Sequence, residues 1–419
     1  MKRFICVVLF ILIFSLASAE DRTAAISTIK IFIDDTEFSW KRQSEKPQLV
    51  TGDEPVITAE TVISFTSLRP EKKMTRSALE REVNQTELRL DDSGYFYSAK
   101  AVCIQSRKEP ENMIVIITVK SGFLWRFGGG NAYGVFGKSC IDGRRLQVLG
   151  YAGWNKNGAS VLYEHAFDSP AILGSSLFWD GPASLCTSDG TAPGTSGITG
   201  ICTPGFFITP DIRFCTDIIG RVDFSSGFAE DSFCISPFAV CSKFFSRTLT
   251  SVSAAQAYFY PCIEQNPFSG AEIIASINWT PVRYVTFAFC TAGGLSPENN
   301  AHTFNLNWNT AYTSSNTVFE NRIIRSGYKP NELTVEKYLY ASFEARWNMA
   351  DFLLPPAFNV RLQPFVFTDA ALVDRTVRDA FGGGLRILFD NPVFAYFTFC
   401  CGVNHEGAGR FCFAATKGF

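Results

Sequence analysis

The sequence contains little histidine, little methionine and few charged residues. Three of the 419 residues are histidine, four are methionine and 19% are charged. So few imidazoles leave little material for a zinc site or for histidine-based catalysis. The 38 basic and 40 acidic residues give a net charge of -2, so no basic surplus is available to bind a nucleic-acid backbone. We therefore expect no enzyme, no nucleic-acid partner, no metal and no cofactor.

Long hydrophobic runs are also scarce. The one at residues 4–16 follows Lys2 and Arg3 and precedes three small residues at 17–19, which is the pattern of a signal peptide covering residues 1–19. After residue 20 there is no run of about 18 apolar residues that would form a transmembrane helix. An exported, apolar chain without spanning helices favours a β-barrel.

Phenylalanine, in contrast, is abundant, with 40 residues in a chain that is 46% hydrophobic. From residue 122 onward, apolar and polar residues alternate with period two in many segments, such as 271–280 and 337–347. This alternation fits a soluble sandwich with its apolar face inside, or a membrane barrel with its apolar face outside.

Two features favour the membrane barrel. Aromatic residues stand at the ends of the alternating segments, as in the girdles of membrane proteins, at Trp279, Trp308, Trp347 and Tyr396. No helical pattern follows that could cover an apolar sheet face. Since a membrane strand takes about 9–11 residues, residues 122–419 predict a transmembrane β-barrel of about 16 antiparallel strands.

Residues 20–121 have a different character, with more charge and with helical signals. We expect a strand over Ile29 to Asp35, then a polar loop, and a short helix that begins at Thr58. A second helix is expected from Thr75 to about Leu90, followed by strands over 98–105 and 113–120. This region therefore predicts a small α+β domain with the order β-α-α-β-β.

The order of these elements and the string LDDSGYFYSAKAV resemble a POTRA domain, a periplasmic module that binds polypeptides. The residues that carry the resemblance are Leu90, Ser93, Gly94, Tyr95 and Phe96. Taken without the resemblance, the same elements fit any small α+β domain.

The second region resembles the barrel of the BamA-like outer-membrane superfamily, which includes BamA, TamA and the two-partner-secretion transporters. Segment 324–328, with Arg325, Gly327 and Tyr328, is similar to the motif of the sixth outer loop in that family, with one inserted serine. Two strands are similar to those that follow this loop in the family: the strand with Glu344 and Arg346, and the strand whose end, residues 365–371, contains Asp369. The last strand, with Phe411, Phe413 and the terminal Phe419, resembles the signal by which bacterial outer-membrane assembly machinery recognises its clients.

Alternation places Glu344, Arg346 and Asp369 on the polar face, which would line the lumen of a barrel. Arg325 has a planar, five-donor guanidinium group suited to bidentate contact with a carboxylate. We expect Arg325 to enter the lumen and pair with Asp369, with Glu344 alongside. The alternative is that Arg325 is a solvated loop residue.

The resemblance implies a protein of the bacterial outer membrane, with the POTRA-like domain of residues 20–121 in the periplasm and the barrel of residues 122–419 in lipid. It implies a role in inserting outer-membrane barrel proteins or in translocating a polypeptide, with unfolded polypeptides as clients and with accessory periplasmic or lipoprotein subunits. The seam between the first strand, 123–130, and the last, 410–418, is expected to pair weakly because the first strand is rich in glycine. The alternatives are a passive pore and a barrel-anchored surface antigen.

Overall fold

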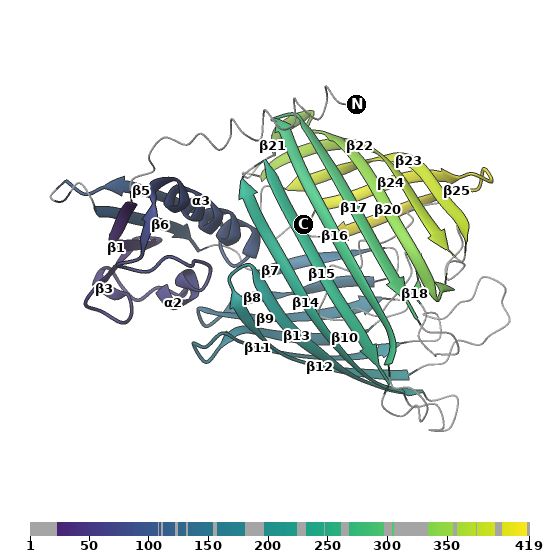
Figure 1. The fold of residues 1–419 in the computed structure, drawn as a ribbon, viewed down its shortest axis with the longest axis horizontal. Helices are drawn as coiled ribbons and strands as arrows, with labels where there is room; N and C mark the ends of the chain where they lie inside the picture. Colours follow the sequence, from purple (N-terminus) through teal and green to yellow (C-terminus); the bar gives the residue numbers. More distant parts are fainter. Residues whose placement is uncertain are drawn as a thin grey trace, which may run out of the picture.

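A computed structural model describes residues 23–107, 109, 112–121, 125–130, 133–153, 157–180, 197–223, 232–246, 248–260, 268–296, 304–305, 334–354, 358–373, 375–389 and 396–416. The chain forms a small N-terminal domain and a closed β-barrel, and the domain lies against one end of the barrel (Figure 1). Among the described residues, no helix has both the length and the hydropathy to cross a membrane.

The N-terminal domain is a mixed sheet with strand order β3-β2-β1-β6-β5, with the short strand β4 beside β1 and with two helices. Strands β1 and β6 pair in parallel, and the other pairs are antiparallel. The elements are β1 (Thr23–Ile33), β2 (Thr36–Lys41), β3 (Gln48–Thr51), α2 (Ala59–Ile63), β4 (Lys73–Thr75), α3 (Arg76–Ser93), β5 (Ser98–Gln105) and β6 (Asn112–Lys120).

Both predicted helices are confirmed, and both begin where a threonine can cap them. The hydroxyl of Thr58 accepts a hydrogen bond from the N–H of Thr61, and that of Thr75 accepts one from Ala78. Helix α3 ends at Gly94, whose φ of 68° is the left-handed conformation that glycine adopts without strain. Leu79 and Val83 of α3 are buried in one core with alternate residues of β1 and β6.

The structure adds strands to the predicted order. We expected a polar loop between the first strand and the first helix, but β2 and β3 lie there. Strand β2 pairs with β1, and β3 pairs with β2. Strand β2 has a short alternation, in which Phe38 and Trp40 are buried. All four residues of β3 are exposed, so this edge strand has no apolar alternation from which it could be predicted.

In the described residues, the barrel wall has 17 strand segments. They are β7 (Trp125–Gly130), β8 (Tyr133–Ile141), β9 (Arg144–Gly153), β10 (Asn157–Ala166), β11 (Ala171–Asp180), β12 (Gly197–Thr209), β13 (Ile212–Asp223), β14 (Ser232–Ser246), β15 (Leu249–Phe259), β16 (Phe268–Val282), β17 (Val285–Leu295), β20 (Lys337–Trp347), β21 (Ala350–Leu354), β22 (Phe358–Val373), β23 (Thr376–Phe389), β24 (Tyr396–Asn404) and β25 (Gly409–Thr416). A separate ladder joins β18 (Phe304–Asn305) to β19 (Thr334–Val335). Since β20 and β21 pair with successive stretches of β22, they are one interrupted strand, and the predicted count of about 16 is confirmed.

The predicted sidedness is also confirmed. In β16, the side chains of Ile273 and Trp279 are 63% and 49% exposed, while Glu272, beside Ile273, is 2% exposed. In β20, Leu339 is 60% exposed and its neighbour Tyr340 is 1% exposed. The apolar half of each alternation therefore lies on the outside of the barrel, and the more polar half faces the interior.

The two ends of the barrel have different connections. The end that contacts the N-terminal domain, the near rim, has tight hairpin turns at residues 141–144, 209–212, 246–249 and 282–285. Every second connection along the chain lies at the far rim, beginning with the one between β7 and β8. The connection between β17 and β20 is the sixth at that rim.

Candidate functional site

The predicted motif at the end of α3 lies at the contact between domain and barrel. The hydroxyl of Ser93 donates to the carbonyl of Leu90 at 2.7 Å and accepts from the N–H of Tyr95 at 3.1 Å, which closes the helix end. Tyr95 and Phe96 are buried in the domain core. The hydroxyl of Tyr95 also reaches Glu164 of the barrel strand β10, at 3.4 Å. The motif therefore both ends the helix and contacts the barrel.

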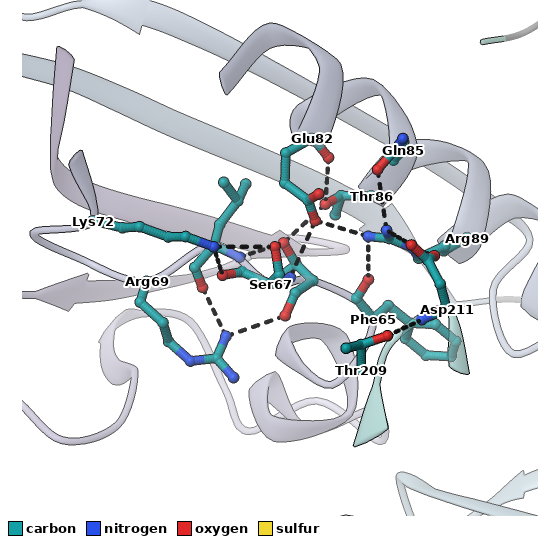
Figure 2. Close-up of polar contacts among 12 residues, drawn as sticks. Phe65, Ser67, Arg69, Lys72, Glu82, Gln85, Thr86, Arg89, Thr209 and Asp211 are labelled. Atoms are coloured by element: carbon teal, nitrogen blue, oxygen red, sulfur yellow. Dashed lines mark hydrogen bonds and ion pairs between the residues drawn. The ribbon is translucent and has the colours of Figure 1, made fainter. Parts of the chain in front are cut away.

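Arg89 of α3 contacts a carboxylate of the barrel (Figure 2). Its Nε and one terminal nitrogen donate to the two carboxylate oxygens of Asp211, at 2.6 and 2.9 Å, in the turn between β12 and β13. Burial alone would lower the pKa of Arg89, but hydrogen bonds and charge from Asp211 and Glu82 outweigh burial and raise that pKa above its ordinary value. Arg89 is therefore a charged, buried residue with a bidentate partner in the barrel.

In a second arginine contact, the cation belongs to the barrel and its partners include residues of the N-terminal domain. Arg145 of β9 donates to Glu164 at 2.6 Å and to the hydroxyl of Ser64 at 3.2 Å. Its guanidinium carbon lies 3.7 Å from the centre of the Phe65 ring, a cation–π contact with the N-terminal domain. Below these residues, the hydroxyl of Thr61 donates to the carbonyl of Gly143 in the turn between β8 and β9.

Within the barrel, Glu344 is the centre of a group of charged residues. It is 3% exposed and accepts from the Nε of Arg346 at 2.5 Å and from Arg386 of β23 at 3.0 Å. A second nitrogen of Arg346 donates to Asn278 of β16 at 3.2 Å, so this group joins the polar faces of several strands. Two of the predicted residues, Glu344 and Arg346, are thus brought together.

Asp369 of β22 is fully buried and accepts from the hydroxyl of Ser342 at 2.7 Å. Arg325, Gly327 and Tyr328 lie outside the described residues, and the pairing of Arg325 with Asp369 stays a prediction. Of the predicted C-terminal signal, Phe411 is 58% exposed, Phe413 lies opposite Phe399 in the strand register, and Phe419 is outside the described residues.

The barrel closes where its first strand meets its last. Among the described residues, β25 pairs with β7 at two positions, Ala414 with Gly130 and Ala415 with Gly129. In comparison, β24 and β25 pair at eight positions, and β7 and β8 at five. Strand β7 is described from Trp125 to Gly130, within the predicted first strand of residues 123–130, and residue 123 lies outside the described residues. The seam is therefore closed by the fewest backbone contacts among these pairs.

Comparisons with solved structures assign the fold. The chain is similar to CdiB from Escherichia coli with a TM-score of 0.54 and 10% sequence identity, over 93% of this chain and 76% of that one. CdiB from Acinetobacter baumannii matches with a TM-score of 0.51 and 10% identity, over 93% and 73% of the two chains. The chain has the CdiB fold. The fold expected from the resemblance to the BamA-like superfamily is therefore confirmed.

Other comparisons are weaker. BamA from Haemophilus ducreyi lacking POTRA domains 1–3 matches with a TM-score of 0.46 and 11% identity, over 91% of this chain and 88% of that one. No family model and no curated protein matches the sequence.

Sequence reasoning missed the arginine contacts between the domain and the barrel. Arg89 and its acceptor Asp211 are 122 positions apart, and Asp211 by itself is an ordinary turn residue. One local signal was present. Glu82, Gln85 and Arg89 follow each other at spacings of three and four on α3, which places them on one face with buried Val83 and Thr86 beside them.

Proposed function

We propose that the chain is a bacterial outer-membrane protein that handles polypeptides, either by inserting other barrel proteins into the membrane or by translocating a polypeptide across it. The CdiB fold and the apolar outer face of the barrel support this localisation. In the outer membrane, the barrel would be oriented with its near rim towards the periplasm. The N-terminal domain, which we propose to be a POTRA domain, would then lie in the periplasm.

The observation that carries the proposal is the seam between β7 and β25, where the first and last strands of the barrel pair at two positions within the described part of the chain. Backbone N–H and C=O groups at a strand edge can pair with an incoming extended segment. Strand β5 provides a second edge at the end of the N-terminal sheet. A client strand would bind at such an edge by its backbone, so the protein would accept clients of different sequence.

The proposed partners follow from these surfaces. Unfolded polypeptides would bind the N-terminal domain, membrane lipid would contact exposed side chains such as Ile273 and Leu339, and accessory periplasmic or lipoprotein subunits would assist. No cofactor and no catalytic step is part of the proposal.

The alternative of a passive pore is less well supported. Side chains on the inner face would contact water in an open channel, but Asp217 and Asp369 are 0% exposed and Glu272 is 2% exposed. A passive pore also needs no domain at its near rim.

A disulfide across the seam tests the proposal. We expect Gly129→Cys with Ala415→Cys, which replaces Cα partners of β7 and β25, to cross-link the seam under oxidation. The cross-link should lower the amount of other outer-membrane barrel proteins, or of one secreted polypeptide, and reduction should restore it. The matched control is Gly200→Cys with Gly220→Cys, which are Cα partners in β12 and β13 with open space beside both.

The readout distinguishes the two roles. A general loss of barrel proteins indicates insertion, and loss of a single secreted product indicates translocation. The passive pore replaces this proposal under two conditions. The cross-linked protein supports insertion and translocation as well as the protein without the cross-link, and depletion of the protein impairs only solute uptake.

A further inference from the structure

The contact between the N-terminal domain and the near rim contains two buried arginines. Arg89 belongs to the domain and contacts the barrel, and Arg145 belongs to the barrel and contacts the domain. They are 6% and 8% exposed. A buried charge is stable only with partners in good geometry, so each arginine restricts the relative position of the groups around it. Buried arginines of this kind are not expected at a contact between two domains that move freely relative to each other.

Every N–H of the Arg89 guanidinium has an acceptor. Three bonds stay within the domain, to Glu82 at 2.8 Å, to Gln85 at 3.2 Å and to the carbonyl of Phe65 at 3.4 Å. The other two N–H groups donate to the carboxylate of Asp211. The domain thus holds the planar guanidinium in one orientation before it meets the barrel, which the flexible ammonium of a lysine would not allow.

The acceptor is also held in place. The N–H of Asp211 donates to the hydroxyl of Thr209 at 3.3 Å, and its carbonyl accepts from the N–H of Ser242, in strand β14, at 2.8 Å. The carboxylate therefore stands on a turn that is bound to the neighbouring hairpin. Neither partner of the Arg89–Asp211 pair has to be ordered when the contact forms.

Phe65 links this pair to the second arginine. Its carbonyl accepts from Arg89, and its ring lies against the guanidinium of Arg145. A third contact lies at Gly143, where an added Cβ atom would come within 1.9 Å of the carbonyl oxygen of Val56. The three contacts lie on two separate hairpins, at the turns after β8 and β12 and at the start of β9, and together they restrict rotation of the domain.

This attachment determines where the sheet edge lies. Ser98, the first residue of β5, pairs with Lys120, the last residue of β6. Strand β7 of the seam begins at Trp125, so its first Cα lies within about 18 Å of Lys120 even along a fully extended chain. The chain therefore keeps the start of β5 near β7 in any orientation, and a domain that cannot rotate also fixes the direction in which the β5 edge runs relative to the seam.

We propose that Arg89 and Arg145 are positioning residues that lock the N-terminal domain to the barrel in one orientation and so fix the direction of the β5 edge relative to the seam. The use of that edge rests on the proposed function, whereas the lock itself does not. Client strands would then pass between two edges at a constant separation, without a domain movement.

Distance measurements on the full chain in lipid nanodiscs test the lock without any client. Bio-orthogonal spin labels are placed at Lys100 of β5 and at Arg283 of the near rim, both exposed, because the chain has thiols of its own. We expect one narrow distance distribution for the unchanged sequence. Asp211→Asn, which alters only a barrel turn, and Arg145→Gln should each add a population at other distances, and the two together should broaden the distribution further.

Two controls separate loss of the lock from loss of folding. Arg76→Gln removes the exposed ion pair with Glu80 on the same helix and should leave the distribution unchanged. Labels at Arg283 and Arg375, on opposite rims of the barrel, should report the same distance in every variant. A distribution as narrow in the Asp211→Asn and Arg145→Gln double variant as in the unchanged chain overturns the lock, whatever the seam experiment shows.

Discussion

At the residue scale, two buried carboxylates of the barrel wall differ in what they already bind. Glu344 accepts from two guanidinium groups, those of Arg346 and Arg386, while Asp369 accepts from a hydroxyl. At Glu344, two guanidinium groups already surround one carboxylate, so a third would increase the excess of positive charge there. That Arg325 pairs with Asp369, in preference to Glu344, stays a prediction.

A pair of double-mutant cycles tests this preference. We expect Arg325→Gln and Asp369→Asn to be coupled by about 1–3 kcal/mol in the free energy of unfolding, because contacting residues are not additive. Arg325→Gln and Glu344→Gln should be additive within about 0.5 kcal/mol. The measurement is urea unfolding of the barrel in detergent or lipid. Additivity in the Asp369 cycle would indicate that Arg325 is a solvated loop residue.

What the sequence predicted at this scale depended on distance along the chain. The residues from Leu90 to Phe96 could be recognised because their bonds, such as that from Ser93 to Leu90, close within one turn. Arg89 and Asp211 could not be paired, since nothing in a single sequence relates a helix residue to a turn 122 positions away.

At the element scale, helix α3 depends on its two ends. We expect Thr75→Ala to cost about 1 kcal/mol through loss of the cap. Gly94→Ala should cost about 1–2 kcal/mol, because alanine at a φ of 68° is strained. Both are measured as a lower urea midpoint of the N-terminal domain in the full chain, followed by the fluorescence of Trp40. Arg76→Ala, in an exposed pair, should change it by less than about 0.5 kcal/mol.

If the Thr75 and Gly94 variants unfold at the same urea concentration as the Arg76 variant, the caps contribute nothing and the packing of Leu79 and Val83 alone maintains α3. These helix ends could be predicted because caps are local. Strands β2 and β3 could not be predicted so easily, since β2 has six residues and the stability of β3 comes from pairing with β2.

At the scale of the whole molecule, alternation was sufficient for the number of strands and for the side of each that faces outward, because a barrel repeats one pattern. The placement of the domain on the near rim was not predictable in this way. It depends on a few turns, such as the one at Gly143, whose contacts with Val56 and Thr61 exist only in the folded chain.

The sidedness of the barrel leads to a prediction about lipid contact. In chains that retain a single tryptophan, with phenylalanine at the other six positions, lipids brominated on the acyl chain should quench Trp279, which is 49% exposed on the outer face. They should leave Trp40, which is 6% exposed in the N-terminal domain, at its original intensity. Trp347, at the end of β20 and 41% exposed, should behave as Trp279 does. A soluble sandwich would place its apolar face in a core that lipid cannot reach. If the fluorescence of Trp279, like that of Trp40, is the same in brominated as in ordinary lipid, the result contradicts a membrane barrel.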